Sequence, residues 1–194
     1  VKPSIIWGFN ELALTGSDDL AAAYQKKFGK ALETDQPNAT YAWLDALAKN
    51  NPILATTGED SAAAVGAPNQ TEPRIGFFSN ATFRDIETKS YQLKVCSGLT
   101  PWAGFVYPTY PMIATNAPSP NAAKLFVRFL LTQEGVDPYI HDGGAPTIKG
   151  GKAGEFPPGM TGLDGLSRFN SANLAKDFEN AQQMQDFWRN SHGG

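Results

Sequence analysis

Three turns in this sequence place small hydroxyl side chains where an extended segment is expected to lead into a helix or loop. They are Pro3-Ser4 ahead of Trp7-Gly8, then Thr56-Thr57-Gly58, and then Ser79-Asn80-Ala81-Thr82. Helix N-termini expose backbone N–H groups and carry partial positive charge, so they attract anions. In open α/β sheets, ligands bind beyond the carboxyl ends of the strands. These turns therefore predict a ligand surface, and simple helix capping is the competing explanation for each of them.

The expected ligand contacts come from these turns and from one aromatic segment. The ring of Trp7 is suited to stacking on a ligand, and burial in the core is the alternative. Tyr107 lies in the apolar, proline-broken segment 102–111, where hinge packing is the alternative. The predicted ligand-binding residues are Ser4, Trp7, Gly8, Thr56, Thr57, Ser79, Asn80, Thr82 and Tyr107.

The sequence carries none of the common catalytic signatures. It has no G-x-S-x-G elbow, no P-loop and no G-x-G-x-x-G fingerprint. The only cysteine, Cys96, falls in a predicted alternating strand and is expected to be a small core residue. His141 and His192 lack the spacing of metal ligands, so a zinc site is not expected. We therefore predict a binding protein with no catalytic residues, no metal and no cofactor.

Composition limits the partners of the chain. Its 194 residues are 41% hydrophobic and 11% aromatic, enough for a core in one large domain or two small ones. The net charge of -3 gives no basic footprint for nucleic acid, and no apolar run approaches the length of a membrane span. Three N-x-S/T triplets begin at Asn38, Asn69 and Asn80; they accept glycans only on a eukaryotic secretory route, and chance explains them as well.

Hydrophobic spacing predicts helices alternating with short strands, which is typical of an α/β fold. The stretch from Thr147 to about Gly165 is rich in glycine and proline and is expected to be a long loop. Helices are expected at 17–32, 39–50, 59–65, from about 121 to Gly135, and at 173–189. Strands are expected at 53–55, 75–79, 91–97 and within 103–115.

The most distinctive segment runs from Ile113 to Thr147 and predicts the end of a strand, a polar turn, an amphipathic helix and a glycine-rich exit. It resembles the late signature of bacterial extracellular solute-binding proteins of the two-lobed type 2 class, which serve ABC importers. Within that class the likeness is to the iron- and organic-anion-binding group. The matching residues are Ala117, Pro118, Pro120, Asn121, Ala122, Ala123, Lys124, Leu125, Phe126, Leu130, Leu131, Glu134, Gly135, Gly144 and Pro146.

The resemblance implies an α/β, type 2 periplasmic-binding-protein-like fold in which helices flank a mixed sheet. The family pattern begins before this chain does, so the first lobe is expected to be missing. Residues 1–100 would then form the middle lobe, and residues 101–194 the hinge return and C-terminal segments.

The function implied is that of the substrate-binding component of an ABC transporter, which captures a small solute in a cleft between lobes for import. The expected solute is an organic anion, a phosphate-bearing compound or a sugar-like compound. The expected protein partners are the importer's membrane subunits and the missing N-terminal lobe as a separate piece. The implied location is periplasmic or extracellular, with the protein lipid-anchored or secreted.

Ferric members of the family hold the metal with adjacent tyrosines in a segment similar to residues 75–85. Here no two tyrosines are adjacent, and Ser79, Asn80 and Thr82 offer neutral donors instead. Tyrosinate-bound iron is therefore not expected. Two alternatives stay open: an enzyme on the same two-lobed architecture, as in hydroxymethylbilane synthase and some thiamine-pathway proteins, and a secreted adhesion or interaction module.

Overall fold

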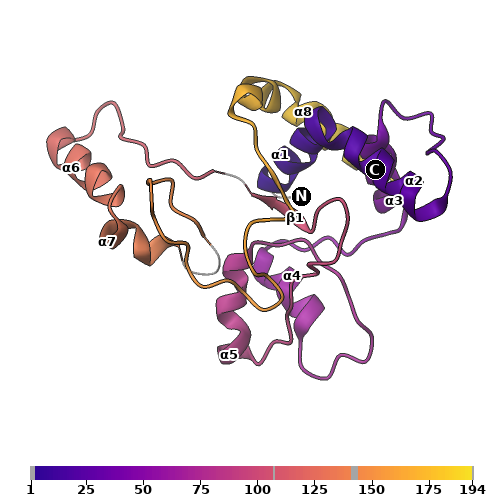
Figure 1. The fold of residues 1–194 in the computed structure, drawn as a ribbon, viewed down its shortest axis with the longest axis horizontal. Helices are drawn as coiled ribbons and strands as arrows, with labels where there is room; N and C mark the ends of the chain where they lie inside the picture. Colours follow the sequence, from indigo (N-terminus) through magenta and orange to yellow (C-terminus); the bar gives the residue numbers. More distant parts are fainter. Residues whose placement is uncertain (1–2, 107, 141–143, 194) are drawn as a thin grey trace. The chain divides into compact units, whose positions relative to one another are not determined.

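The computed structural model describes residues 3–106, 108–140 and 144–193, and these residues form mainly helices (Figure 1). None of the described helices has the length and apolar character needed to cross a membrane. The elements in chain order are α1 (Pro3–Glu11), the π-helix η1 (Leu12–Gly16), α2 (Ser17–Phe28), α3 (Ala39–Lys49), α4 (Gly58–Gly66), the 3-10 helix η2 (Asn80–Arg84), α5 (Asp85–Lys89), β1 (Gly104–Val106), α6 (Pro120–Leu130), α7 (Gln133–Val136), η3 (Asp137–Tyr139), β2 (Leu166–Arg168), η4 (Ser171–Asn173) and α8 (Leu174–Ser191).

The contacts divide the chain into two compact units. Unit 1 combines three separate stretches, Val1–Thr57, Cys96–Tyr107 and Leu163–Gly194. Unit 2 consists of Gly58–Val95 and Pro108–Gly162. The lobes expected from the resemblance, 1–100 and 101–194, stay a prediction.

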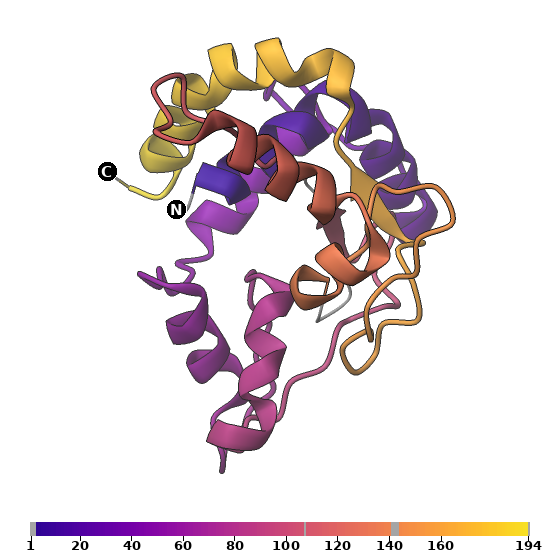
Figure 2. The same cartoon turned by 90° about the vertical axis from the view of Figure 1, so that its left-hand side faces the viewer.

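The core of unit 1 joins the first and last helices of the chain, α1 and α8, which lie side by side in both views (Figures 1 and 2). The ring of Phe9 packs edge-on against Trp43 of α3, with centroids 5.8 Å apart, and lies 6.0 Å from the ring of Trp188. Burial of each large apolar side chain contributes roughly 1.5–3 kcal/mol. The buried cluster consists of Ile6, Phe9, Leu44, Ala48, Met184 and Trp188.

Local signals account for the helix ends in unit 1. Asp18 and Asp19 lie in the first turn of α2, where carboxylates favour the positive end of the helix, and Gly29 ends the helix in the left-handed conformation with φ of 71°. The side chain of Asn38 caps α3 by accepting hydrogen bonds from the N–H groups of Thr40 and Tyr41. The predicted helices at 39–50 and 173–189 are confirmed, and the helix predicted at 17–32 is confirmed as far as Phe28.

The expected mixed sheet is wrong. The described residues contain one sheet, in which β1 pairs in parallel with β2, with Gly104 opposite Leu166. An extended apolar segment becomes a strand only where a neighbour satisfies its N–H and C=O groups. The segments 53–55, 75–79 and 91–97 form no strand pairing in the described part of the chain. Ile53 and Ile75 are 72% and 73% exposed, and segment 91–97 makes only isolated backbone bonds, such as Val95 N–H to the Pro158 carbonyl at 2.8 Å. Cys96, expected in the core, is exposed.

Unit 2 contains two groups of packed helices. In one, α4 packs against η2, and α5 follows η2 directly. The chain after α5 contacts the end of α4: Gln92 N–H donates to the carbonyl of Gly66, the last residue of α4, at 2.8 Å. In the other, α6 packs against α7. The predicted helix start near Asn121 is confirmed, but Gly135 does not end that helix: α6 ends at Leu130, and Gly135 lies inside α7.

Candidate functional site

The turn at 56–58 leads into α4, as the sequence predicts. Thr56 and Thr57 are exposed ahead of the helix, and Gly58 is buried at its first position. Glu59 and Asp60 follow in the first turn and are exposed. Their carboxylates already complement the partial positive charge of the helix N-terminus. An uncharged solute therefore suits this turn better than an anion does.

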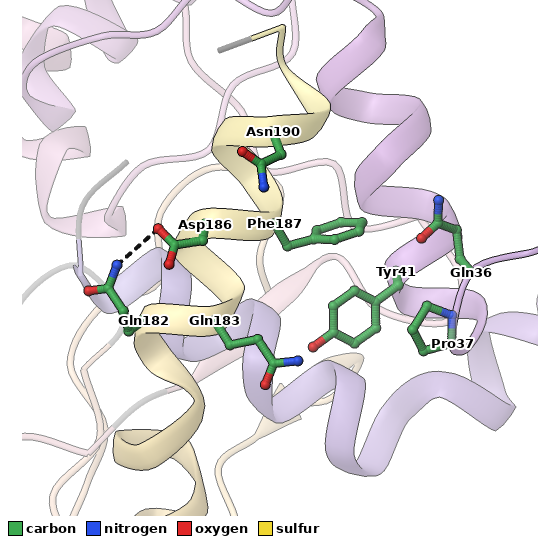
Figure 3. A pocket seen from close by; sticks show the side chains of 8 residues that line it. All are labelled: Gln36, Pro37, Tyr41, Gln182, Gln183, Asp186, Phe187 and Asn190. Atoms are coloured by element: carbon green, nitrogen blue, oxygen red, sulfur yellow. Dashed lines mark hydrogen bonds between the residues drawn. The ribbon is translucent and has the colours of Figure 1, made fainter.

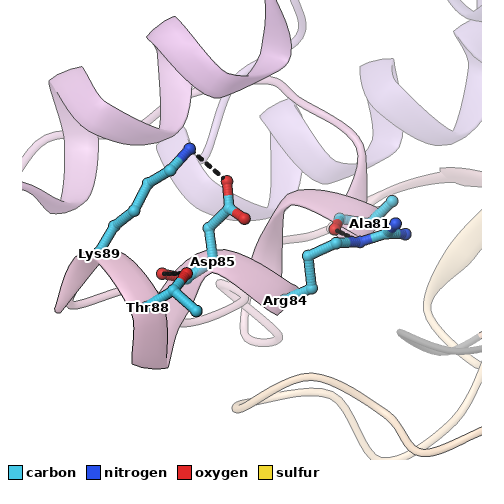
Figure 4. Close-up of polar contacts among 5 residues, drawn as sticks. All are labelled: Ala81, Arg84, Asp85, Thr88 and Lys89. Atoms are coloured by element: carbon cyan, nitrogen blue, oxygen red, sulfur yellow. Dashed lines mark hydrogen bonds and ion pairs between the residues drawn. The ribbon is translucent and has the colours of Figure 1, made fainter.

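The turn at 79–82 uses much of its polar capacity within itself. The Ser79 hydroxyl accepts a hydrogen bond from Ala81 N–H at 3.3 Å, and Thr82 N–H donates to the Ser79 carbonyl at 3.1 Å. Arg84 Nε donates to the Ala81 carbonyl at 2.6 Å (Figure 4). Thr82 is only 5% exposed. The side chain of Ser79 therefore caps η2, and Asn80 is half-buried.

The helix α5 that follows this turn is held by its own polar contacts. Lys89 Nζ lies 2.7 Å from Asp85 Oδ2, one helical turn away, and this hydrogen bond raises the pKa of Lys89 above its ordinary value (Figure 4). The Thr88 hydroxyl donates to the Asp85 carbonyl at 3.4 Å.

The three predicted contacts near the N-terminus all lie on α1. Trp7 is 43% exposed, so part of its ring is open to solvent. Gly8 is buried, and a Cβ at this position would run into the ring of Phe105 on β1. Gly8 is therefore explained by the close approach of helix and strand. The side chain of Ser4 is outside the described part of the structure.

The predicted residues fall into both units. Ser4, Trp7, Gly8, Thr56 and Thr57 belong to unit 1. The turn at 79–82 belongs to unit 2, and Tyr107 lies outside the described residues. The gathering of these residues on one ligand surface stays a prediction.

A hollow of about 570 Å³ lies between α8 and the N-terminal part of α3 in unit 1 (Figure 3). The rings of Tyr41 and Phe187 meet edge to face, with centroids 4.8 Å apart, and partial burial raises the pKa of Tyr41. Gln182 Nε2 donates to Asp186 Oδ1 at 3.0 Å. An aromatic wall with amide groups is a common setting for small polar molecules. The lining residues are Gln36, Pro37, Tyr41, Gln182, Gln183, Asp186, Phe187 and Asn190.

This hollow was not predicted from the sequence, although the sequence contains a signal for it. Gln182, Asp186 and Asn190 are spaced by four residues, so they form a polar stripe along one face of α8. The stripe alone is typical of a solvated helix face. Only the loop ahead of α3, which brings Gln36 and Pro37 beside it, makes the face concave.

Among the described residues, no group of three or more His, Cys, Asp and Glu side chains is arranged to hold a metal ion. The chain was also compared with known proteins, and no family model, curated protein or solved structure matches it.

Proposed function

We propose that this chain is the substrate-binding component of an ABC importer, or a part of it, and that it captures a small solute. The observation that carries the proposal is the local structure of segment 113–147, on which the resemblance to solute-binding proteins depends. Helix α6 begins at Pro120, directly after the polar turn, and Pro at the first helical position is favourable. The helix thus starts at the point that the resemblance implies.

The return from this helix is held by specific contacts. The Thr132 hydroxyl accepts a hydrogen bond from Gly135 N–H at 3.1 Å and so caps α7. Gln133 then binds the later loop through both ends of its amide: Oε1 accepts from Lys152 N–H at 2.8 Å, and Nε2 donates to the Lys152 carbonyl at 3.3 Å. Gly154 N–H donates to the Gly144 carbonyl at 3.0 Å and closes the loop. These bonds hold α7 against the later loop at Lys152 and join Gly144 to Gly154.

For the solute, we place uncharged hydroxylated compounds ahead of carboxylates and phosphates. Glu59 and Asp60 at the start of α4 repel an anion at the turn of Thr57, and the Ser79 hydroxyl is already engaged in capping. Asn80 and the exposed threonines are neutral groups that can both donate and accept hydrogen bonds. Such groups match the hydroxyls of a sugar-like solute.

Isothermal titration calorimetry of the full-length protein against neutral sugars, polyols, carboxylates, organic phosphates and ferric citrate tests this proposal. We expect binding to a neutral hydroxylated compound. Thr57→Ala and Asn80→Ala should each weaken it by roughly two- to tenfold, because one neutral hydrogen bond contributes about 0.5–1.5 kcal/mol. Thr71→Ala, at an exposed threonine away from both turns, is the matched control and should leave the affinity unchanged.

The possible failures are distinguishable. Binding that neither Thr57→Ala nor Asn80→Ala changes would remove the site assignment and keep the function. Preferential binding of a carboxylate or phosphate would contradict the proposed solute class. Absence of binding to every compound, together with no association with importer membrane subunits, would contradict the function itself.

A further inference from the structure

Two buried carboxyl groups lie where the end of α1 meets the start of α8. Glu11 is 1% exposed and Asp177 is 4% exposed. Asn10 Nδ2 donates to Asp177 Oδ1 at 2.8 Å. Asp177 Oδ2, in contrast, is buried and has no hydrogen-bond partner among the described residues. A buried carboxylate oxygen without a donor is costly, so this atom requires an explanation.

Glu11 has the donors that Asp177 lacks. Its Oε1 accepts from the backbone N–H of Asn170 at 3.1 Å and from Asn173 Nδ2 at 3.3 Å, and Thr15 Oγ1 lies 3.2 Å away. All of these donors are neutral. The two carboxyl groups therefore differ in their surroundings: Glu11 Oε1 accepts several hydrogen bonds, and Asp177 Oδ2 accepts none from the described residues.

We propose that Asp177 takes up a proton from solvent and uses it to donate a hydrogen bond to the Glu11 carboxylate. This shared proton stabilises the packing of α8 against α1. The protonated oxygen is Oδ2, which then becomes a donor. With the proton bound, the two carboxyl groups together carry one negative charge instead of two. Release of the proton places two adjacent anions in a buried site and loosens the junction of the two helices.

The pKa of Asp177 agrees with this arrangement. Burial, the negative charge of Glu11 and a hydrogen bond with Glu11 together raise the pKa from 3.8 to about 6, while the Asn10 hydrogen bond lowers it.

The other ionisable groups on the packed elements do not contribute to this shift. Lys49 pairs with Asp45 on α3 at 2.7 Å, and Arg189 lies 3.4 Å from Asp186 on α8. Apart from Glu11, helices α1, η1 and η4 carry no charged side chain among their described residues. The remaining ionisable residues are Tyr41 on α3, Lys176 and Glu179 on α8, and His192, which directly follows α8. His192 requires its own control, because its ring Nε2 is buried without a hydrogen-bond partner among the described residues.

The direction of the pH effect follows from the proton count. The folded chain keeps the Asp177 proton up to about pH 6, whereas the unfolded chain releases it near pH 3.8. The folded state therefore binds more protons in this window, and its stability falls as the pH rises from about 4 to about 6. The folding equilibrium should weaken by roughly ten- to a hundredfold across the window.

Urea unfolding of the whole chain at about pH 5 and about pH 8, followed by circular dichroism, tests the proposal. Asp177→Asn replaces the carboxyl group by an amide, which stays neutral at every pH tested. The variant should therefore be more stable than the parent at about pH 8, and its free energy of unfolding should lose the part of the pH dependence that Asp177 causes. Glu179→Gln, on the exposed side of α8, and His192→Gln should both keep that share. A pH dependence that Asp177→Asn leaves unchanged, or that His192→Gln removes, would overturn the proposal.

A second measurement needs no variant. Side-chain carboxyl carbon shifts of the parent chain, followed by NMR during a pH titration, should show one aspartate with a midpoint near 6. Asp177→Asn or, if that chain does not fold, Glu11→Gln assigns the signal by removing it or by lowering its midpoint. If every aspartate titrates near the ordinary value of about 3.9, the shared proton does not exist.

Discussion

At the scale of single residues, the side chains that hold this structure together are mostly polar groups close to helix ends. Asn38 is the clearest example. Its Oδ1 accepts from the N–H groups of Thr40 and Tyr41 at 3.1 and 3.2 Å, and its Nδ2 donates to the Ala13 carbonyl at 3.1 Å. One amide thus caps α3 and ties it to η1. The same bonds occupy the nitrogen to which a glycan would be attached.

Asn38→Ala should lower the free energy of unfolding by about 1–2 kcal/mol, because it removes a helix cap and leaves backbone groups unsatisfied. Urea unfolding monitored by circular dichroism measures the change. Asn50→Ala at the exposed C-terminal end of α3 is the matched control and should cost much less. Equal losses in the two variants would show that the capping bonds of Asn38 do not stabilise the fold.

The candidate ligand residues show how far residue types alone can be taken. Two of the three hydroxyl-bearing turns lead into helices, because capping is a local preference that the sequence carries directly, whereas Ser4 lies within α1. Two of the residues have other roles: Gly8 allows Phe105 to approach α1, and Ser79 caps η2. The sequence alone does not distinguish either role from ligand binding. The role of Gly8 depends on Phe105, which is distant in the chain, and the role of Ser79 depends on the local backbone conformation.

At the scale of elements, the helices were largely predictable and the strands were not. Helix α2 has its signals within the helix and one residue beyond it, from Asp18 to Gly29. A strand depends on a partner, and the apolar residues of 53–55 and 75–79 give no information about whether one is present. The pairing of Gly104 with Leu166 joins residues far apart in the chain, and the second of them follows a stretch that looks like a loop.

The corner between α6 and α7 gives a prediction at this scale. A Cβ on Gly135 would clash with the backbone carbonyl of Phe129, so Gly135→Ala requires the corner to shift. We expect a loss of about 1–3 kcal/mol in local stability, seen as faster amide hydrogen exchange in peptides that cover residues 129–140. Gly162→Ala, in the same unit and with nothing near its added Cβ, should leave that exchange unchanged. Unchanged exchange in Gly135→Ala would mean that the corner is looser than described.

At the scale of the whole molecule, the main feature is that unit 1 is assembled from both ends and the middle of the sequence. Its core needs α8 to cover α1 and α3, and Met184 at the centre of that contact is fully buried. Such an arrangement makes the N-terminal and C-terminal helices depend on one another for stability, although more than 150 residues separate them.

Met184→Ala should therefore speed hydrogen exchange in α1 and α8 together, with a loss of roughly 2–5 kcal/mol in the stability of unit 1. Peptides from α4 and α5, which belong to unit 2, should exchange as in the parent. Gln185→Ala, at the exposed neighbouring position, is the control. Faster exchange confined to α8 would show that the first and last helices do not form one cooperative core.

The division into units also determines which part of the protein tryptophan fluorescence monitors. All four tryptophans, Trp7, Trp43, Trp102 and Trp188, belong to unit 1, so indole emission is a signal from that unit. An unfolding curve recorded by indole fluorescence will follow unit 1 even where unit 2 melts separately. The exposed thiol of Cys96 is a single attachment point for a fluorescent dye, so a second fluorophore can be added without any change to the sequence.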